Sequence, residues 1–266
     1  TRPLPAAVHF ARTLRVPAPA DELFAWHERP GAFERLAPPW QRVEVLETDG
    51  SVRDGARVRI RARVAPPALA RLFQYRHAVT AADLARHADA RARGLAPLTV
   101  AVTGASGMIG SSLVPFLTTG GHTVVRVGRS APRSPSPQLR DVAWDPARGR
   151  LDPAALEGVD AVVHLAGANV GGRWTAAYKD EILRSRVDST RLLAETIARL
   201  ERPPRVLVSM SAVGYYGDRG DEVLDESSPP GRGFLADVTQ RWEAAADPAR
   251  AAGVRVVHPR LGVVLS

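Results

Sequence analysis

Hydroxyl side chains gather directly after an apolar segment in the last quarter of the sequence. The segment RVLVSM (205–210) is typical of a buried strand and runs into SMSAVGYYGD (209–218). The hydroxyl-bearing residues of interest there are Ser209, Ser211, Tyr215 and Tyr216. Enzymes with α/β folds place catalytic groups at the carboxyl ends of their strands. Serine can polarise a substrate oxygen and tyrosine can transfer its proton, but an unassisted phenol titrates near pH ~10. The stretch therefore predicts an active-site cleft.

A second group of residues has the spacing of a phosphate-binding turn. The segment TVAVTGASGMIGSSL holds Gly104, Gly107 and Gly110 between a strand-like run and a helical run. In that context the first glycine permits a tight turn, the second lets the backbone approach a pyrophosphate, and the third lets helix and strand pack closely. The start of the helix adds amide donors and a positive dipole. We therefore expect a dinucleotide at this turn.

The strand after the glycine turn favours NADP(H) over NAD(H). An NAD-selective site places an acidic residue near the end of that strand, where it binds the ribose 2′-hydroxyl. Here the strand ends with Val127, Gly128, Arg129 and Ser130, and none of them is acidic. Arg129 can pair with a 2′-phosphate. A solvent-facing arginine is the alternative interpretation in this arginine-rich chain.

The elements that must position these residues alternate between strand and helix from about residue 98 onward. Strands are predicted at 98–102, 123–128, 161–166, 205–210 and 254–259. Helices are predicted at 107–117, about 175–200 and 234–246, with a polar loop at 130–138. In the long helix, the apolar spacing predicts one buried stripe through Leu183, Val187, Thr190, Ala194 and Ile197. The pattern predicts an α/β fold with a doubly wound parallel sheet of the Rossmann type.

The first 97 residues have a different character. Strands are predicted at 8–16, 42–48 and 56–64, with helical stretches at 19–26, 30–40 and 80–94. In the third strand, Arg57, Arg59, Arg61 and Arg63 alternate with apolar residues, which predicts a half-exposed strand with a solvated face. We expect three parts, namely a ligand-binding domain at 1–79, a helical linker at 80–97 and a nucleotide-binding domain at 98–266.

The second half resembles the extended, epimerase-like branch of the short-chain dehydrogenase/reductase superfamily. The glycine spacing is TGxxGxxG, and further matching stretches are WDP (144–146), DAVVHLAGANV (160–170), GRWTAAYKDEILRSRVDSTRLL (172–193), the stretch around SMSAVGYYGDRGDE and RLGVVLS (260–266). They resemble an atypical subfamily of nucleoside-diphosphate-sugar epimerase-like proteins. The resemblance implies a carbonyl/alcohol or sugar-nucleotide-like substrate. It also implies that the family pattern continues past Ser266 into a substrate lobe.

By this resemblance, the superfamily uses a serine, a tyrosine and a lysine four residues after the tyrosine. None of the four tyrosines has lysine at that position, and the register of GFLADV places Phe234 and Val238 where tyrosine and lysine are expected. Ser211 best matches the serine, and Tyr216 is the candidate substitute acid. The alternative is that the tyrosines only pack or contact substrate.

The same resemblance yields the remaining site residues. The residues expected to bind the cofactor are Thr103, Gly104, Ser106, Gly107, Met108, Ile109, Gly110, Arg129, Leu165, Ala166, Gly167 and Ser209. Those expected to contact substrate are Asn169, Tyr215, Lys179 and Arg260. A solvated surface position is the alternative for Lys179, the only lysine, and His164 is expected to be a packed residue.

The first half resembles a START-like domain of the polyketide-cyclase type. VPAPADELFAWHERPGAFERLAPPW (16–40) matches its first strand and two short helices, and the segment from Leu72 to Gly104 resembles the junction to an epimerase-like domain. The resemblance implies a partial α+β (helix-grip) fold and an apolar ligand. Such a domain has ~100 residues or more, so the resemblance implies either a degenerate domain or further residues between Val64 and Ala68.

Composition limits the other classes of function. The chain has 266 residues, a net charge of +8 and no cysteine, which excludes disulfides and thiolate metal sites and fits a reducing cytoplasm. No metal-ligand spacing occurs, and no nucleic-acid motif or membrane-length apolar run accompanies the arginines. We expect a cytoplasmic protein whose partners are small molecules, with no nucleic acid, membrane or metal partner.

Three hypotheses follow. The first is an NADP(H)-dependent oxidoreductase or epimerase without the tyrosine–lysine pair. The second is an NADP(H)-binding sensor or scaffold with little turnover. The third is a START-like module that binds an apolar ligand and passes it to the nucleotide-binding domain.

Overall fold

The computed structural model describes residues 12–41, 44–49, 57–61, 66–129 and 136–265. Its contacts divide the chain into two units, Thr1–Ala96 and Pro97–Ser266. The second unit begins one residue before the predicted nucleotide-binding domain. No helix in the described residues is both long and apolar enough to cross a membrane.

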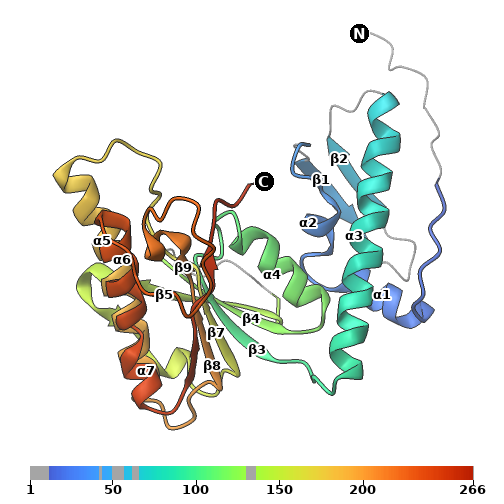
Figure 1. The fold of residues 1–266 in the computed structure, drawn as a ribbon. Coiled ribbons are helices and arrows are strands. Elements are labelled where there is room, and N and C mark those ends of the chain that lie inside the picture. The colour runs from blue at the N-terminus through green and yellow to red at the C-terminus, as the bar shows by residue number, and fades with distance from the viewer. Residues whose placement is uncertain (1–11, 42–43, 50–56, 62–65, 130–135, 266) are drawn as a thin grey trace. The chain divides into compact units, whose positions relative to one another are not determined.

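The described part of the first unit contains three helices and a two-stranded antiparallel sheet (Figure 1). The helices are α1 (Ala20–Glu28), α2 (Ala32–Leu36) and α3 (Pro66–Ala92); the strands are β1 (Glu44–Asp49) and β2 (Arg57–Arg61). Residues 12–16 form no strand, and 8–11 lie outside the described residues. The arginine-face prediction concerns side chains that are also outside the described part.

Helix α3 covers most of the segment that the sequence analysis assigned to a linker. Its 27 residues run through position 80 without a break, and its second half packs on α2. Asp83, fully buried, accepts two hydrogen bonds from Arg35 of α2, at 2.8 Å from Nε and 2.6 Å from Nη2. Leu84 joins Trp26 and Ala32 in a small apolar core. Residues 83 and 84 therefore belong physically to the first unit.

The second unit is built on a seven-stranded sheet with the order β10-β8-β7-β3-β4-β5-β6. All neighbouring pairs are parallel except β5–β6, which is antiparallel. The strands are β3 (Thr99–Thr103), β4 (Thr123–Gly128), β5 (Leu139–Asp145), β6 (Arg150–Leu151), β7 (Ala161–His164), β8 (Val206–Ser209) and β10 (Arg255–Val257). The predicted Rossmann-type α/β arrangement is confirmed for this unit.

Helices cover both faces of this sheet, with α4 on one face and α5, α6 and α7 on the other (Figure 1). Their bounds are α4 (Gly110–Thr119), α5 (Ala176–Ile197), α6 (Phe234–Ala244) and α7 (Asp247–Ala251). The smaller elements η2 (Pro146–Arg148), η3 (Pro153–Ala155) and η4 (Val213–Tyr216), and the parallel strand pair β9 (Ser211–Ala212) and β11 (Arg260–Leu261), lie in its connections. Five predicted strands and three predicted helices have counterparts. The sequence analysis did not identify β5, β6, β9, β11 or α7.

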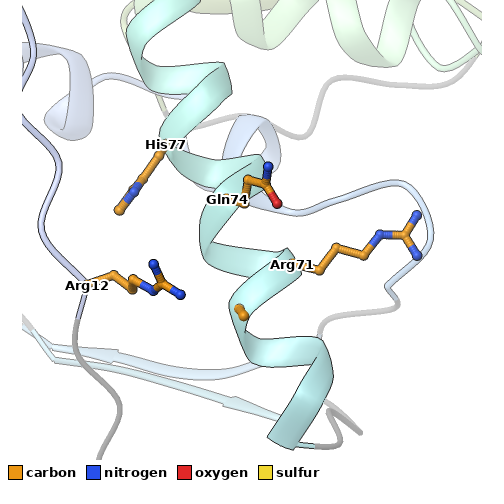
Figure 2. Close-up of a pocket in the computed structure, with 5 residues that line it drawn as sticks. Arg12, Arg71, Gln74 and His77 are labelled. Atoms are coloured by element: carbon orange, nitrogen blue, oxygen red, sulfur yellow. The ribbon is translucent and has the colours of Figure 1, made fainter.

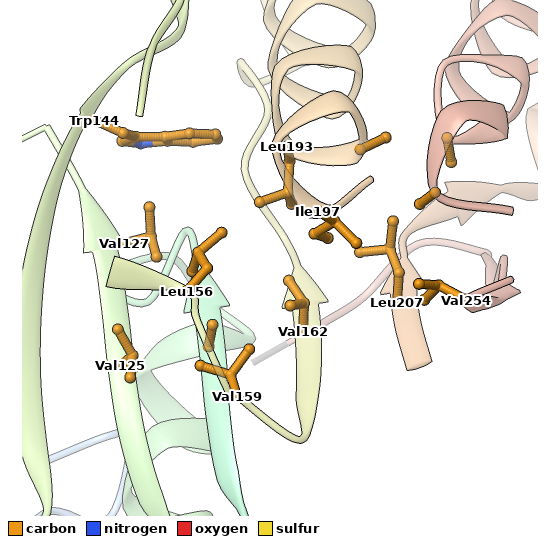
Figure 3. Packing of buried hydrophobic residues seen from close by; sticks show 14 residues of the cluster. Val125, Val127, Trp144, Leu156, Val159, Val162, Leu193, Ile197, Leu207 and Val254 are labelled. Atoms are coloured by element: carbon orange, nitrogen blue, oxygen red, sulfur yellow. The ribbon is translucent and has the colours of Figure 1, made fainter. Parts of the chain in front are cut away.

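The larger core lies between the sheet and α5. Figure 3 shows Leu193 and Ile197 of α5 beside Val162 of β7 and Leu207 of β8, and all four are fully buried. Apolar burial of this kind contributes roughly 25 cal/mol per Å². The opposite face buries Val100, Val102 and Val124 against α4. Continuous Val and Leu runs are required because both faces of a parallel sheet are covered.

The predicted buried stripe of α5 is only partly correct. Thr190, Ala194 and Ile197 are buried, whereas Leu183 and Val187 are half-buried. The fully buried positions nearer the start of the helix are Ile182 and Ser189. The apolar pattern could not reveal Ser189 because its burial depends on a hydrogen bond to the sheet, described below.

The Asp83–Arg35 pair provides a stability test for the first unit. Replacing Asp83 with alanine leaves a half-buried guanidinium without its acceptor, so we expect unfolding of α2 and α3 to become easier by about 3 kcal/mol. Urea unfolding of the full chain, with hydrogen exchange read on α2 and α3, measures this. Asp89→Ala breaks an exposed pair with Arg93, the residue that follows α3, and should change stability by less than about 0.5 kcal/mol. Equal effects of the two variants would contradict the prediction.

Candidate cofactor and substrate site

Four strands end together at one edge of the sheet. Thr103 of β3 pairs with Val127 of β4 and with His164 of β7, and His164 pairs with Ser209 of β8. The chain leaves β3 toward β4 on one side and returns to β7 on the other. The carboxyl edge between β3 and β7 is therefore a topological switch point, where open α/β sheets bind their ligands.

The glycine turn lies at that switch point. Gly104 adopts a positive φ of 65°, and a Cβ there would lie 2.8 Å from the carbonyl carbon of Leu165 and 2.9 Å from the amide nitrogen of Ala166. A Cβ on Gly110 would collide with the backbone of Gly104 and Ala105. The two glycines are thus required by the close approach of the turn to β7 and to itself.

The middle of the turn faces outward. Ser106, Gly107 and Met108 are exposed, with Met108 at 53%, and the Gly107 amide donates to the Gly104 carbonyl at 2.9 Å. A Cβ on Gly107 would meet only that carbonyl, at 3.2 Å. Ile109, half-buried, precedes α4. This is the open side that a pyrophosphate needs.

A chain of buried hydrogen bonds joins the turn to α5. Thr103 Oγ1 accepts from the amides of Leu165 and Ala166, at 3.1 and 3.2 Å, so its own proton goes to His164 Nδ1 at 2.6 Å. His164 Nε2 must then carry the other proton and donate to Ser189 Oγ at 3.2 Å. Ser189 in turn donates to the Ser185 carbonyl at 2.7 Å. The network holds His164 neutral, and burial lowers its pKa to about 4.

Arg129 follows β4 directly and is exposed. No described residue forms an ion pair or hydrogen bond with it, whereas Arg126, three residues earlier, is held by Asp141 at 2.7 Å. Asp145, at the end of neighbouring β5, is used by η2, where it accepts from the Arg148 amide. Arg129 is therefore available to an anion.

Ser211 and Tyr216 are brought together, but both are buried and already bonded. Ser211 Oγ donates to Glu243 Oε1 of α6 at 2.6 Å. Arg260 binds both oxygens of Glu243 at 2.9 Å and also donates to the Tyr216 hydroxyl at 2.9 Å. The Arg260 guanidinium lies 3.4 Å from the ring centroid of Tyr215. One network thus joins β9, η4, α6 and β11.

Charge within this network is balanced. Burial raises the pKa of Glu243, but hydrogen bonds from Arg260 and Ser211 outweigh it, so the pKa lies below its usual value. The hydrogen bond to Glu243 raises the pKa of Arg260. No described residue accepts the Tyr216 proton, so this phenol can still donate. The Ser209 side chain is buried without a partner among the described residues.

The remaining predicted substrate residues lie in or beside the loop that follows β7. Asn169 supports that loop, since its side chain accepts from the Gly171 amide at 2.9 Å and its carbonyl accepts from the Tyr178 hydroxyl at 2.6 Å. Lys179 is half-buried, and its Nζ lies 5.2 Å from the ring centroid of Phe234 and 5.9 Å from that of Trp174.

Phe234 is half-buried at the start of α6, and Val238 is buried within it. Val238 is an apolar side chain in a buried position, and it can neither donate a proton nor lower the pKa of a tyrosine. The structure gives no replacement for the missing pair at these two positions.

The sequence analysis missed three residues of this region, Glu243, Ser189 and Arg186. Glu243 lies nine residues after Phe234 and binds Ser211 across 32 positions of sequence, so no local pattern reveals it. Ser189 has a faint signal, since a serine lies among the buried positions of an amphipathic helix. Arg186 lies within a quoted family stretch, and its half-buried state emerges only from the packing of α5 on α6.

The described residues contain no cluster of three or more potential metal ligands, and the acidic loop 218–226 is largely exposed. In the first unit, a cavity of about 600 Å³ is lined by Arg12, Ala70, Arg71, Gln74 and His77 (Figure 2). Arg12 and Arg71 lie on different sides of α3 in this view. The lining exposes polar and apolar atoms in about equal measure, so it does not decide the class of ligand, and the apolar ligand stays a prediction.

Comparison with known proteins places the second unit in a family. Residues 100–264 match the model of the NAD dependent epimerase/dehydratase family. An epimerase family protein of Mycobacterium bovis is 43% identical over 173 residues, covering 65% of this chain and 56% of the relative. A chloroplastic epimerase family protein of Arabidopsis thaliana is 38% identical, covering 63% and 49%. The chain thus spans about half the length of these relatives.

Similar solved structures include one that matches most of the chain and one that contains a bound nucleotide. A nucleoside-diphosphate sugar epimerase from Corynebacterium glutamicum is 31% identical, with a TM-score of 0.76, and the match covers 94% of this chain and 65% of that one. A human epimerase family protein, SDR39U1, solved with NADPH, is 34% identical with a TM-score of 0.50, covering 63% and 55%.

His164 makes stability depend on pH. Its pKa of about 4 in the folded chain lies below the usual 6.5, so the unfolded chain binds more protons between these values. Stability should be full above pH 6.5 and fall by up to about 3 kcal/mol as the pH drops to 4. Urea unfolding at pH 7.5, 6.0 and 4.5 measures this. His164→Asn, which cannot titrate, should show a shallower dependence, and identical slopes would contradict the assignment.

Proposed function

Because the chain belongs to the NAD-dependent epimerase/dehydratase family, we propose that it binds NADP(H) and acts as an oxidoreductase or epimerase on a carbonyl/alcohol or sugar-nucleotide-like substrate. The observation that carries this proposal is the turn from Gly104 to Gly110, placed at the switch point between β3 and β7. The glycines keep the turn close to β7 and leave its outer side open. The chemistry supplied by the nicotinamide is hydride transfer, and the protein supplies binding, orientation and proton transfer.

Selectivity for NADP(H) rests on Arg129. It is exposed, follows β4 and has no acidic partner among the described residues, and Gly128 before it adds no side chain. The human relative solved with NADPH supports the same preference. A 2′-phosphate would receive charge-assisted hydrogen bonds from this guanidinium.

Arg129→Ala tests the cofactor assignment. We expect NADPH affinity to fall about tenfold or more, since a charge-assisted hydrogen bond contributes roughly 1.5–3 kcal/mol, while NADH affinity stays within about twofold. Titration calorimetry with both nucleotides measures this. Arg140→Ala on neighbouring β5 removes another exposed arginine and should leave both affinities unchanged. Equal losses for NADPH and NADH would remove the basis for selectivity.

For proton transfer, we propose Ser211 and Tyr216. Tyr216 keeps its proton available, because it accepts from Arg260 and no described residue accepts from it. The alternative function is an NADP(H)-binding sensor or scaffold, which the burial of both hydroxyls favours.

Single-turnover hydride exchange between bound NADPH and a library of carbonyl compounds separates these two functions. With a substrate found in this way, Tyr216→Phe should lower the rate by about a hundredfold, the usual contribution of a general acid. Glu243→Gln is the matched control, because it weakens the same network without removing either hydroxyl. If Glu243→Gln slows the reaction as much as Tyr216→Phe, the hydroxyl has no specific role. If wild type exchanges hydride with nothing, the sensor or scaffold function stands.

For the first unit, a START-like ligand-binding domain remains our hypothesis. It rests on the resemblance of residues 16–40 and 72–104; the match to the Corynebacterium structure covers 94% of the chain and so extends into this unit. Native mass spectrometry of the purified full chain would report both a co-purified nucleotide and any ligand of this unit.

A further inference from the structure

Arg186 is a half-buried cation without an acidic partner among the described residues. Its Nη1 donates to the Ile182 carbonyl one turn earlier in α5, at 3.2 Å, and this is its one hydrogen bond within the described part of the chain. Burial lowers the pKa of this guanidinium, opposed by Tyr178. A guanidinium carries five N–H donors, so most of them have no acceptor from those residues. A counter-ion brought by a ligand would offset the cost of this burial.

Two neighbours fix the guanidinium in place. Its Cζ lies 5.1 Å from the ring centroid of Trp242, a buried residue of α6 whose Nε1 donates to Thr190 Oγ1 at 2.9 Å. On the loop after β7, a Cβ added to Gly167 would lie 3.4 Å from Cζ and 3.5 Å from Nη2. The guanidinium is therefore held beside the loop that we expect to contact the cofactor.

A second cation lies on the same side of α5. Lys179 precedes Arg186 by seven residues, which is two helical turns and about 10 Å along the axis. Lys179 also lacks an acidic partner among the described residues and lies over Phe234 of α6. Two cations, each set on an aromatic ring of α6, thus line the seam between α5 and α6.

We propose that Arg186 binds an oxyanion, a carboxylate or phosphate, carried by the substrate. The inference rests on the proposed function and narrows it, since it makes the substrate an anion. A planar guanidinium matches two oxygens of such a group. The cofactor's own anions have other sites, because the pyrophosphate is expected at the turn from Gly104 to Gly110 and the 2′-phosphate at Arg129. Gly167 places no side chain against the guanidinium, where even a Cβ would be in van der Waals contact with it.

The test uses simple anions on the full chain. Benzoate and phenyl phosphate are the carboxylate and phosphate probes, and benzyl alcohol is the neutral control. Each is titrated by calorimetry into the protein with and without NADPH, and NADPH affinity is measured separately. The main variant is Arg186→Met, which keeps an apolar stem on Trp242, and Arg186→Lys restores the charge. Arg191→Gln on an exposed position of α5 is the matched control.

We expect wild type to bind at least one anion more tightly than benzyl alcohol, and the preferred probe identifies the class of oxyanion. Arg186→Met should lower the affinity for that anion about tenfold or more and leave the affinity for NADPH within about twofold of wild type. Arg186→Lys should recover part of the loss, and Arg191→Gln should match wild type. The inference is overturned if wild type binds neither anion more tightly than benzyl alcohol, or if Arg186→Met binds the preferred anion with wild-type affinity. It is also overturned if Arg186→Met lowers the affinity for NADPH as much as the affinity for the anion. Failure of wild type to bind NADPH would instead refute the proposed function.

Discussion

The close approach of two backbone segments, at Gly104 and at Leu165–Ala166, is the constraint on which the rest of the second unit depends. These segments end the adjacent strands β3 and β7, and a single methyl group at Gly104 would push them apart. Only glycine permits this close approach, but glycine has no side chain that could stabilise it. Thr103 does so, because its hydroxyl accepts from both amides of the loop and its carbonyl also accepts from the Leu165 amide at 3.3 Å. The Thr103 proton then has one acceptor, His164, and this requirement orders the remaining hydrogen bonds as far as α5.

Helix α5 consequently serves the core and the site with different faces. Leu193, Ala194 and Ile197 bury apolar surface against the sheet. Ser189 completes the His164 network, and Thr190 accepts from Trp242 of α6. The same helix carries Lys179 in its first turn and Arg186 at its middle, each over an aromatic ring of α6. Packing of the two helices is thus coupled to the position of two cations at the edge where a ligand is expected. A substitution among the core residues of α5 would therefore also shift the two cations at that edge.

Sequence reasoning succeeded where local physics decides the outcome. Neighbouring residues determine the periodicity of the parallel strands and the small size of the glycines in the turn. They also determine the start of α5, because Thr175 caps the helix. It failed where partners come from distant segments. Strand β5 is not fully buried and carries charged residues, so its pattern lacks the apolar run that revealed β3 and β7. The long helix α3 was only half predicted, since the expected helix began at residue 80 whereas α3 begins at Pro66. The Ser211–Glu243 and Arg186–Trp242 contacts each join segments that no spacing rule relates.

The network around Tyr216 shows how this chain differs from the superfamily that it resembles. There, a lysine brings an unbalanced positive charge to its tyrosine, and this charge favours the phenolate. Here, the cation next to the phenol is Arg260, and both oxygens of Glu243 already neutralise it. The same carboxylate also takes the Ser211 proton, so the serine hydroxyl acts as a donor to the protein in this state. A substrate oxygen that accepted the Ser211 proton would have to displace Glu243 as its acceptor. Glu243 would then lose one donor and keep both hydrogen bonds from Arg260, so the arginine would stay neutralised beside the phenol. Ser211 and Tyr216 are thus linked through one ion pair, Glu243 with Arg260, and this pair orients both hydroxyls without bringing a net positive charge to the phenol.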